Sequence, residues 1–354
     1  MRKGMRRFIL VVSTIYMYSS LISCNDRKVE EEEVRDIKIG ISIYEQDDIF
    51  ISSIISNIEN ITKEKRNEGS YNITLNVEDA KSNQYNQNEQ VDMFIDQGYD
   101  VMCINLVDRR SAANIINKAK NANIPVIFFN REPVEEDINL WNKVYYVGAK
   151  AEMSGYMQGK IVLDEYNKDN MSVDKNNDGK LQYVMLEGEP EHQDSLIRTE
   201  STIKKITSVG IEVEKLASDS ANWQNSQAYE KTSQWINEFG DKIEVVFSNN
   251  DDMALGAIHA FENSNISLEN RPIIVGIDGI PEALTAIKNG SMKGTVFNDY
   301  ITQAKEMIDI CYDLKYDENS KLIREINNTK SFKTSYKKIT NDNVENYINN
   351  ENLY

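Results

Sequence analysis

The chain is short of cysteine and of positive charge, and both shortages narrow what it can be. Its 354 residues include three cysteines, and 57 Asp and Glu outnumber 40 Lys and Arg, so the formal net charge is −17. Such an acidic surface disfavours binding to nucleic acid or to anionic lipid. No apolar run beyond the first 23 residues is long enough to span a membrane. Any transport across a membrane would therefore need another protein.

Two of the cysteines, Cys103 and Cys311, lie within apolar stretches of the sequence. Cysteines in such contexts are usually buried free thiols, and we expect that here. A disulfide bond between the two remains open if the chain is exported.

The N-terminus predicts an export signal. Four basic residues within the first seven positions precede the apolar stretch 8–22, which is too short for a comfortable membrane span. Its end, Leu-Ile-Ser-Cys24, resembles the lipobox of bacterial lipoproteins, in which the cysteine receives a diacylglycerol. We predict a signal peptide over 1–23 and a lipid anchor on Cys24. An ordinary signal peptide with an incidental cysteine is the alternative.

Residues 24–35 are charged, include four consecutive glutamates, and show no apolar period. We predict that they form a flexible acidic stalk. Cleavage would remove the four basic residues of the signal and shift the net charge from −17 to −21. About 330 residues would remain, which suits two domains of ordinary size.

After the stalk, short β-branched runs alternate with helix-length segments, which indicates an α/β protein with mostly parallel sheets. Predicted helices include 111–122, 152–166 and 252–263. Ten strands are too many for one small sheet, so we predict two doubly wound domains. The predicted strands are 37–43, 73–77, 101–104, 126–129, 145–147, 183–186, 211–216, 245–248, 273–277 and 294–297.

Polar and aromatic residues follow most of these strands, where open α/β sheets bind their ligands. Paired donors and acceptors suit sugar hydroxyls, and the aromatic rings could cover the C–H faces of a sugar. Singly, each polar residue could instead be a helix cap or turn residue, and each ring a core aromatic. The candidates are Asp48, Phe50, Asn105, His192, Asp194, Arg198, Trp223, Asn250, Asp278 and Asn298.

The segment 174–182 has the spacing of the first nine positions of an EF-hand Ca²⁺ loop, with oxygen donors at alternate positions and glycine at the sixth. Position twelve is Met185 instead of a bidentate glutamate, and Glu244 is the candidate for the missing ligand. A structural calcium ion is the prediction, and a plain turn is the alternative.

Several segments together resemble the bacterial galactose/glucose-binding proteins of the periplasmic binding protein type. They include 43–50, 104–108, 125–133, 145–148, 188–194, 243–251 and 294–299, within a match that covers about 36–347. The resemblance implies that Phe50 and Trp223 sandwich a sugar ring. It also implies that eight polar groups hydrogen-bond the sugar: Asp48, Asn105, His192, Asp194, Arg198, Asn250, Asp278 and Asn298. Calcium would be held by Asp174, Asn176, Asp178, the Lys180 carbonyl, Gln182 and Glu244.

The family's fold has two lobes joined by three crossings of the chain, expected here near Phe129, Thr295 and Lys330. The N-terminal lobe would then comprise 36–129 and 296–330, and the C-terminal lobe 130–295 and 331–354. The resemblance implies a periplasmic binding protein type I fold.

The resulting hypothesis is a monomeric receptor, anchored by lipid outside the cytoplasmic membrane or in the periplasm. It would close on galactose or glucose and deliver the sugar to an ABC permease. One alternative is a sensory subunit for a chemoreceptor or sensor kinase. Another is a sugar-active enzyme using two of Asp48, Asp194 and Asp278 as acid and base. A repressor core is disfavoured by the export signal and acidic charge. The sequence does not rank galactose against glucose.

Overall fold

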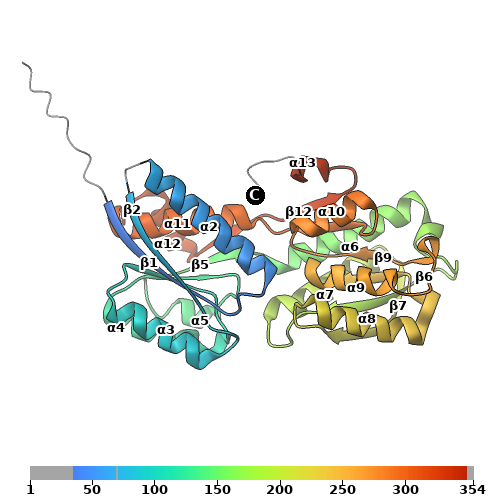
Figure 1. Ribbon diagram of the computed structural model, residues 1–354, viewed down its shortest axis with the longest axis horizontal. Helices are drawn as coiled ribbons and strands as arrows, with labels where there is room; N and C mark the ends of the chain where they lie inside the picture. The colour runs from blue at the N-terminus through green and yellow to red at the C-terminus, as the bar shows by residue number, and fades with distance from the viewer. Residues whose placement is uncertain (1–34, 69–70, 349–354) are drawn as a thin grey trace, which may run out of the picture. The chain divides into compact units, whose positions relative to one another are not determined.

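Two six-stranded sheets organise the chain, as the strand rhythm predicts (Figure 1). The structure is a computed structural model and describes residues 35–68 and 71–348. Residues from Asp36 onward form one compact unit. The predicted signal peptide, the lipidation site Cys24 and all but the last residue of the predicted stalk lie outside the described residues.

The first sheet has the strand order β11-β5-β4-β3-β1-β2, and we call it and the helices packed on it the first lobe. β1 pairs in parallel with β3, β3 with β4, β4 with β5 and β5 with β11. Its central strands β3 and β4 are buried at every residue, which explains their purely apolar sequences. The strands are β1 (Arg35–Ile43), β2 (Tyr71–Asp79), β3 (Val101–Ile104), β4 (Val126–Phe129), β5 (Val144–Ala149) and β11 (Ser331–Thr334).

The second sheet has the order β12-β10-β9-β8-β6-β7 and defines the second lobe. Its pairings are parallel except that of β10 with β12, which is antiparallel. The strands are β6 (Lys180–Glu187), β7 (Glu212–Ser220), β8 (Val245–Ser248), β9 (Ile273–Val275), β10 (Gly294–Phe297) and β12 (Lys337–Thr340).

Helices connect every pair of successive strands except β11 and β12, as expected for βα units. α11 packs on α2 and β3 in the first lobe, although it follows a strand of the second (Figure 1). The helices are α2 (Ile49–Asn67), α3 (Gln84–Asp96), α4 (Ala112–Ala122), α5 (Glu135–Ile138), α6 (Ala151–Lys168), α7 (Gln193–Thr207), α8 (Asn225–Phe239), α9 (Asp251–Glu262), α10 (Pro281–Asn289), α11 (Tyr300–Tyr316), α12 (Lys321–Thr329) and α13 (Glu345–Ile348).

Three crossings of the chain occur, as the resemblance implies, but each lies later in the sequence than predicted. The chain leaves the first sheet after β5, returns after β10, and leaves again through residues 335–336 between β11 and β12. The crossing predicted near Phe129 therefore lies about 20 residues too early, that near Thr295 falls inside β10, and that near Lys330 precedes β11. The link 130–143 contains only the single-turn α5, so its sequence did not look like a βα connection within one sheet.

The two strands absent from the prediction, β11 and β12, are polar edge strands. Their sequences, Ser-Phe-Lys-Thr and Lys-Lys-Ile-Thr, bury one residue completely between them. An edge strand with this composition carries no apolar run, and hydrophobic periodicity cannot reveal it.

Cys103 on β3 and Cys311 on α11 are free and buried, as expected from their apolar contexts. Their Sγ atoms lie 3.6 Å apart, whereas a disulfide bond is about 2.0 Å long. Among the described helices, none combines the length and apolar character needed to cross a bilayer.

Candidate functional site

An inner cavity brings together side chains from strand ends of both sheets. The atom-free space at this site, including the part open to solvent, is about 320 Å³. Among the predicted ligand residues it is lined by Asp48, Phe50, His192, Arg198, Trp223, Asn250 and Asp278, and it is also lined by Tyr44, Asn130 and Arg131. The rule that ligands bind beyond the carboxyl ends of strands therefore selected residues that lie together in space.

Three of the polar lining residues are also helix N-caps, so the cap and ligand interpretations hold together. Asp48 Oδ1 accepts from the Ile51 N–H at 3.0 Å, and Asn250 Oδ1 accepts from the Met253 N–H at 3.0 Å. His192 Nδ1 accepts from the Asp194 N–H at 3.1 Å. Each cap fixes one polar atom on the helix and leaves the other directed elsewhere. Capping therefore orients these side chains before any ligand arrives.

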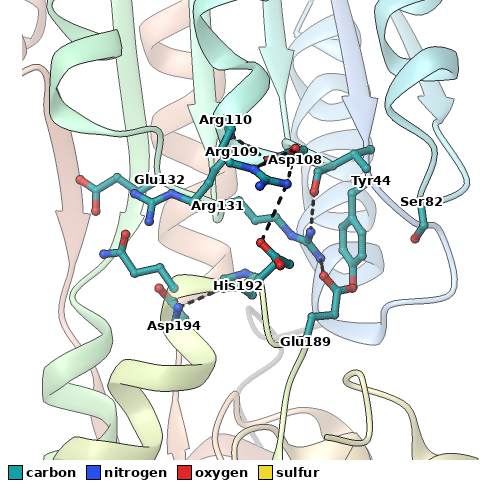
Figure 2. A pocket seen from close by; sticks show the side chains of 13 residues that line it. Tyr44, Ser82, Asp108, Arg109, Arg110, Arg131, Glu132, Glu189, His192 and Asp194 are labelled. Carbon is teal, nitrogen blue, oxygen red and sulfur yellow. Dashed lines mark hydrogen bonds and ion pairs between the residues drawn. The ribbon is translucent and has the colours of Figure 1, made fainter.

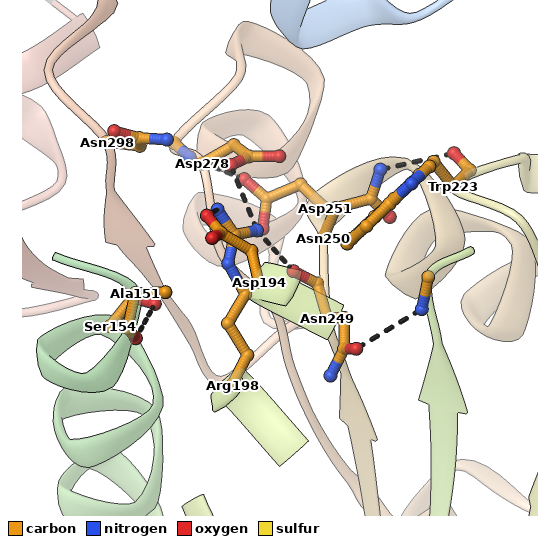
Figure 3. Close-up of polar contacts among 12 residues, drawn as sticks. Ala151, Ser154, Asp194, Arg198, Trp223, Asn249, Asn250, Asp251, Asp278 and Asn298 are labelled. Atoms are coloured by element: carbon orange, nitrogen blue, oxygen red, sulfur yellow. Dashed lines mark hydrogen bonds and ion pairs between the residues drawn. The ribbon is translucent and has the colours of Figure 1, made fainter. Parts of the chain in front are cut away.

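Arg198 is the central cation of the site (Figure 3). It is 4% exposed, and its Nη1 donates to the Asn249 carbonyl at 2.7 Å. The same nitrogen lies 3.6 Å from Asp278 Oδ1, and Nη2 lies 3.7 Å from Asp194 Oδ2. Burial raises the pKa of Asp278 well above its usual value, and the nearby guanidinium partly offsets this. The charge of Arg198 therefore makes the pKa of Asp278 and of the half-buried Asp194 lower than burial alone would make it.

The loop that carries Asp278 is held by Asp251, which lies behind the cavity. Its Oδ2 accepts from the N–H groups of Gly279 at 2.6 Å and Ile280 at 3.1 Å, and its Oδ1 accepts from the Thr295 hydroxyl at 2.6 Å. Burial raises the pKa of Asp251 to about 6, although these donors favour the carboxylate. Asp278 itself has a φ of 129°, a strained conformation that this support maintains.

Two aromatic rings line the inner cavity, one from each lobe. Phe50 packs edge-on to Tyr300 with ring centroids 6.2 Å apart, and Trp223 packs edge-on to His192 at 5.1 Å. Asn222 and Trp223 both have positive φ angles, 50° and 66°, which is unusual for two adjacent residues with side chains. Strain of this kind is typical of sites where a side chain must be aimed at a ligand.

His192 is neutral in this site. Burial, followed by the charges of Arg131, Arg198 and Arg109, lowers its pKa well below the usual value. Because Nδ1 accepts the Asp194 N–H, the ring proton resides on Nε2. His192 can therefore donate one hydrogen bond to a ligand at neutral pH.

Several buried polar atoms of the cavity lining have no hydrogen-bond partner among the described residues. They are Trp223 Nε1, Arg198 Nε, Asp278 Oδ1 and Arg131 Nε. An unpaired buried polar group costs about 1–3 kcal/mol, so such groups rarely gather without a reason. Their convergence on one cavity indicates a site that a polar ligand completes.

Three predicted ligand residues do not line the inner cavity. Asn105 is fully buried and donates to the Phe129 carbonyl and to Asn130 Oδ1, both at 3.1 Å. Asn298 accepts from Gln303 Nε2 at 2.9 Å and hydrogen-bonds Asp278. Asp194 lines the neighbouring cavity. Asn105 therefore orients Asn130, and Asn298 orients Asp278, and both of these partners line the inner cavity.

Sequence reasoning missed Tyr44, Asn130 and Arg131. The Tyr44 hydroxyl donates to Asp48 Oδ2 at 2.6 Å, and the Arg131 guanidinium lies over the Tyr44 ring, 3.6 Å from its centroid. All three follow strands β1 and β4, so position after a strand was an available signal. Their role depends on side-chain direction, which that signal does not give.

A second cavity, here called the outer cavity, adjoins the first and is shown in Figure 2. It holds about 790 Å³ of atom-free space and shares Tyr44, Arg131 and His192 with the inner cavity. The remaining lining comes from Ser82 and from the segments 107–110, 132, 189 and 191–194.

The predicted calcium loop follows the 3-10 helix Asn170–Ser172 and leads into β6. Asp174 accepts from the N–H groups of Asp178 at 3.1 Å and Gly179 at 2.9 Å. Glu244, 1% exposed, reaches the loop and accepts from the Lys175 N–H at 2.7 Å and the Gln182 N–H at 3.0 Å. The distant glutamate therefore lies where the spacing argument needs it.

The oxygen donors of this loop suit calcium, but carboxylates alone do not make the site. Among residues 35–68 and 71–348, no three His, Cys, Asp or Glu side chains cluster closely enough to hold a metal ion. Two amide side chains lie in the same loop: Asn176 Nδ2 donates to Asp178 Oδ2 and to Gln182 Oε1, both at 3.2 Å. Calcium accepts amide and carbonyl oxygens as ligands, so this mixed set fits it. The Lys180 ammonium lies 3.9 Å from Glu212, which leaves its carbonyl as the donor.

Comparison with known proteins agrees with the fold and the cavity. A family model described as a periplasmic binding protein domain matches residues 39–318. The chain is 39% identical over 280 residues to the D-galactose/methyl-galactoside binding periplasmic protein MglB of Haemophilus influenzae, covering 79% of this chain and 82% of the relative. It is 24% identical over 262 residues to the ribose import binding protein RbsB of Bacillus subtilis, covering 74% and 76%.

A solved structure leads to the same class. An ABC transporter solute binding protein from Bacillus halodurans with bound myo-inositol matches with a TM-score of 0.73 and 27% identity, covering 89% of this chain and 98% of that one. The chain therefore belongs to the periplasmic binding protein domain family and has its type I fold of two α/β lobes. It is a binding protein and not an enzyme.

Proposed function

We propose that the protein is a receptor for D-galactose or D-glucose that works outside the cytoplasmic membrane and delivers the sugar to an ABC permease. The observation that carries the proposal is the inner cavity, which is lined by residues with unpartnered buried polar atoms and by two aromatic rings from different lobes. The 39% identity to a D-galactose/methyl-galactoside binding protein supports the choice of sugar. The lipobox-like Cys24 supports a lipid anchor.

Each part of the lining has a role in this proposal. Asp48 and Asp278 accept hydrogen bonds from sugar hydroxyls, while Arg198, Asn250 and His192 donate to sugar oxygens. Micromolar affinity needs about 8 kcal/mol. Hydrogen bonds contribute about 1.5–3 kcal/mol each for the three charged groups and about 0.5–1.5 kcal/mol each for the two neutral ones, which together give a gross energy of the required size. Contact with the two aromatic rings adds to it and can offset the free-energy cost of ordering two lobes around the sugar.

Hinge closure would convert sugar binding into a signal that a permease can recognise. The lining comes from both lobes, so a sugar bound to one lobe gains the remaining contacts when the other closes on it. Only the closed form would present both lobes in the arrangement that the permease recognises.

Isothermal titration of the purified protein against a panel of sugars tests the proposal. We expect micromolar dissociation constants for D-galactose or D-glucose and at least tenfold weaker binding of ribose, xylitol and myo-inositol. Preferential binding of a pentose or a polyol, with neither hexose bound, would show that the sugar is wrongly assigned.

We also propose that the loop 174–182 and Glu244 hold a structural calcium ion. Asp174, Asn176, Asp178, Gln182, Glu244 and the Lys180 carbonyl would be its ligands. Burial raises the pKa of Glu244, and the nearby Asp174 charge raises it further, so a divalent cation would relieve repulsion there. Bound calcium supplies a fixed charge that cross-links the loop to the start of β8.

Calcium is expected to raise the melting temperature of the protein. At a calcium concentration of about 100 times the dissociation constant, stability should rise by about 2.7 kcal/mol, or about 5–10 °C for a lobe of this size. Differential scanning calorimetry with calcium or with a chelator measures the shift. Glu244→Gln should lose most of the calcium response, whereas Glu262→Gln on the exposed surface of α9 should keep it. Identical melting curves with calcium and with chelator would rule out the site.

A further inference from the structure

We propose that the outer cavity is a subsite for a second sugar unit, so that the protein also binds glycosides whose terminal hexose occupies the inner cavity. This inference rests on the proposed function, because it assumes a hexose in the inner cavity. Nothing in the proposed function requires the outer cavity.

The inner and outer cavities are continuous with each other. Tyr44, Arg131 and His192 line both cavities, so a substituent leaving the sugar at that side passes directly into the outer cavity. Figure 2 shows Arg131 between the Tyr44 ring and the His192 segment. The outer cavity is the larger of the two.

The outer cavity has a fixed polar wall. Arg131 is 7% exposed and held on three sides: its Nη1 donates to the Val107 carbonyl at 3.0 Å, its Nη2 lies 2.9 Å from Glu189, and its plane covers Tyr44. Its Nε has no hydrogen-bond partner among the described residues, and neither does the buried Nε of Arg109. Arg131 therefore gives this wall a fixed guanidinium, and Arg109 adds a buried donor without an acceptor.

The charges that line the outer cavity indicate a neutral ligand. Three arginines line the outer cavity, but so do Asp108, Glu132, Glu189, Glu191 and Asp194, so the wall is not net positive. A phosphate or carboxylate substituent would meet these carboxylates and is disfavoured. Alternating donors and acceptors instead match neighbouring hydroxyl groups, each of which both donates and accepts. A neutral sugar is the substituent that this wall fits.

Titration calorimetry with free galactose and glucose, their methyl glycosides, and disaccharides with either hexose at the nonreducing end tests the inference. We expect at least one disaccharide to bind within tenfold of its free hexose. Arg109 lines the outer cavity and not the inner one, so Arg109→Ala should weaken that disaccharide at least tenfold and change hexose affinity less than twofold. Arg324→Ala, at an exposed position on α12, is the matched control and should change neither.

The outcomes separate the inference from the function on which it rests. Binding of hexoses with no binding of any disaccharide would overturn the subsite and leave the proposed function standing. Equal weakening of hexose and disaccharide by Arg109→Ala would also overturn it, as would preference for a sugar phosphate over the neutral sugar. If no hexose binds, the proposed function fails and the subsite fails with it.

Discussion

Arg198→Ala is expected to lower hexose affinity by about a thousandfold, the largest effect of any single substitution in the site. Two hydrogen bonds from the guanidinium to the sugar, at about 1.5–3 kcal/mol each, give that factor at the middle of their range, because about 1.4 kcal/mol is a factor of ten. Removing the guanidinium also leaves Asp194 and Asp278 without their shared cation. Loss of a buried ion-pair partner costs folding stability as well, typically about 3–5 kcal/mol.

The pH dependence of binding distinguishes this mechanism from simple unfolding. Arg198 lowers the pKa of Asp278, so its removal should raise that pKa further above its already raised value. A protonated Asp278 accepts sugar hydroxyls poorly, and residual binding should therefore disappear at a higher pH in the variant than in the parent protein. Titration calorimetry across pH measures the hexose affinity of the variant and of the parent protein.

Two further variants control the Arg198 experiment. Arg198→Lys keeps a cation but not the planar fork that contacts Asn249, Asp194 and Asp278, and should recover only part of the lost affinity. Arg324→Ala should behave as the parent protein. Affinity within tenfold of the parent in Arg198→Ala, with a normal melting curve, would contradict the central role of this residue.

Trp223→Ala is expected to weaken hexose binding by about thirtyfold. The ring lines the inner cavity and is 8% exposed, so its loss removes a preoriented apolar wall from the sugar. Truncation of a buried aromatic anchor commonly costs about 2 kcal/mol or more, which corresponds to that factor. Titration calorimetry is the measurement, and unchanged affinity would refute the stacking role.

Gly188→Ala is a second substitution that should displace the Trp223 ring. A Cβ at position 188 would lie 2.1 Å from Trp223 Cη2 and Cζ2, so the indole would have to move. We expect a loss of hexose affinity approaching that of Trp223→Ala, although the indole itself is retained. Trp141→Phe, which changes a tryptophan outside both cavities, is the control and should bind hexose normally.

The parts of the fold that the sequence predicts well are the buried ones. The predicted limits of β3, β4, β8 and β10 agree with the structure, because each is a short, fully buried apolar run. The prediction failed for the two polar edge strands β11 and β12 and placed the first crossing between the lobes about 20 residues too early. Assigning a strand to a sheet depends on pairing partners distant in sequence, and local periodicity contains no such information.

The candidate site, like the fold, could be predicted from the sequence only in part. Asp48, Asn250 and Asp278 could be found because each follows a buried strand, and strand ends meet at one edge of a sheet. The distinction between Asn105 and Asn130 could not be found, because both follow strands and only the turn geometry decides which side chain faces the cavity. Asn130 has a φ of 59°, which redirects its side chain.

The last two strands, β11 and β12, are consecutive in the chain yet complete different sheets. A growing polypeptide on the ribosome therefore lacks an edge strand of both lobes until residues 331–340 have been synthesised. Domains usually fold in order as they emerge, but here neither lobe can reach its final form before the other has also been synthesised. The two lobes should therefore complete their folding at nearly the same time.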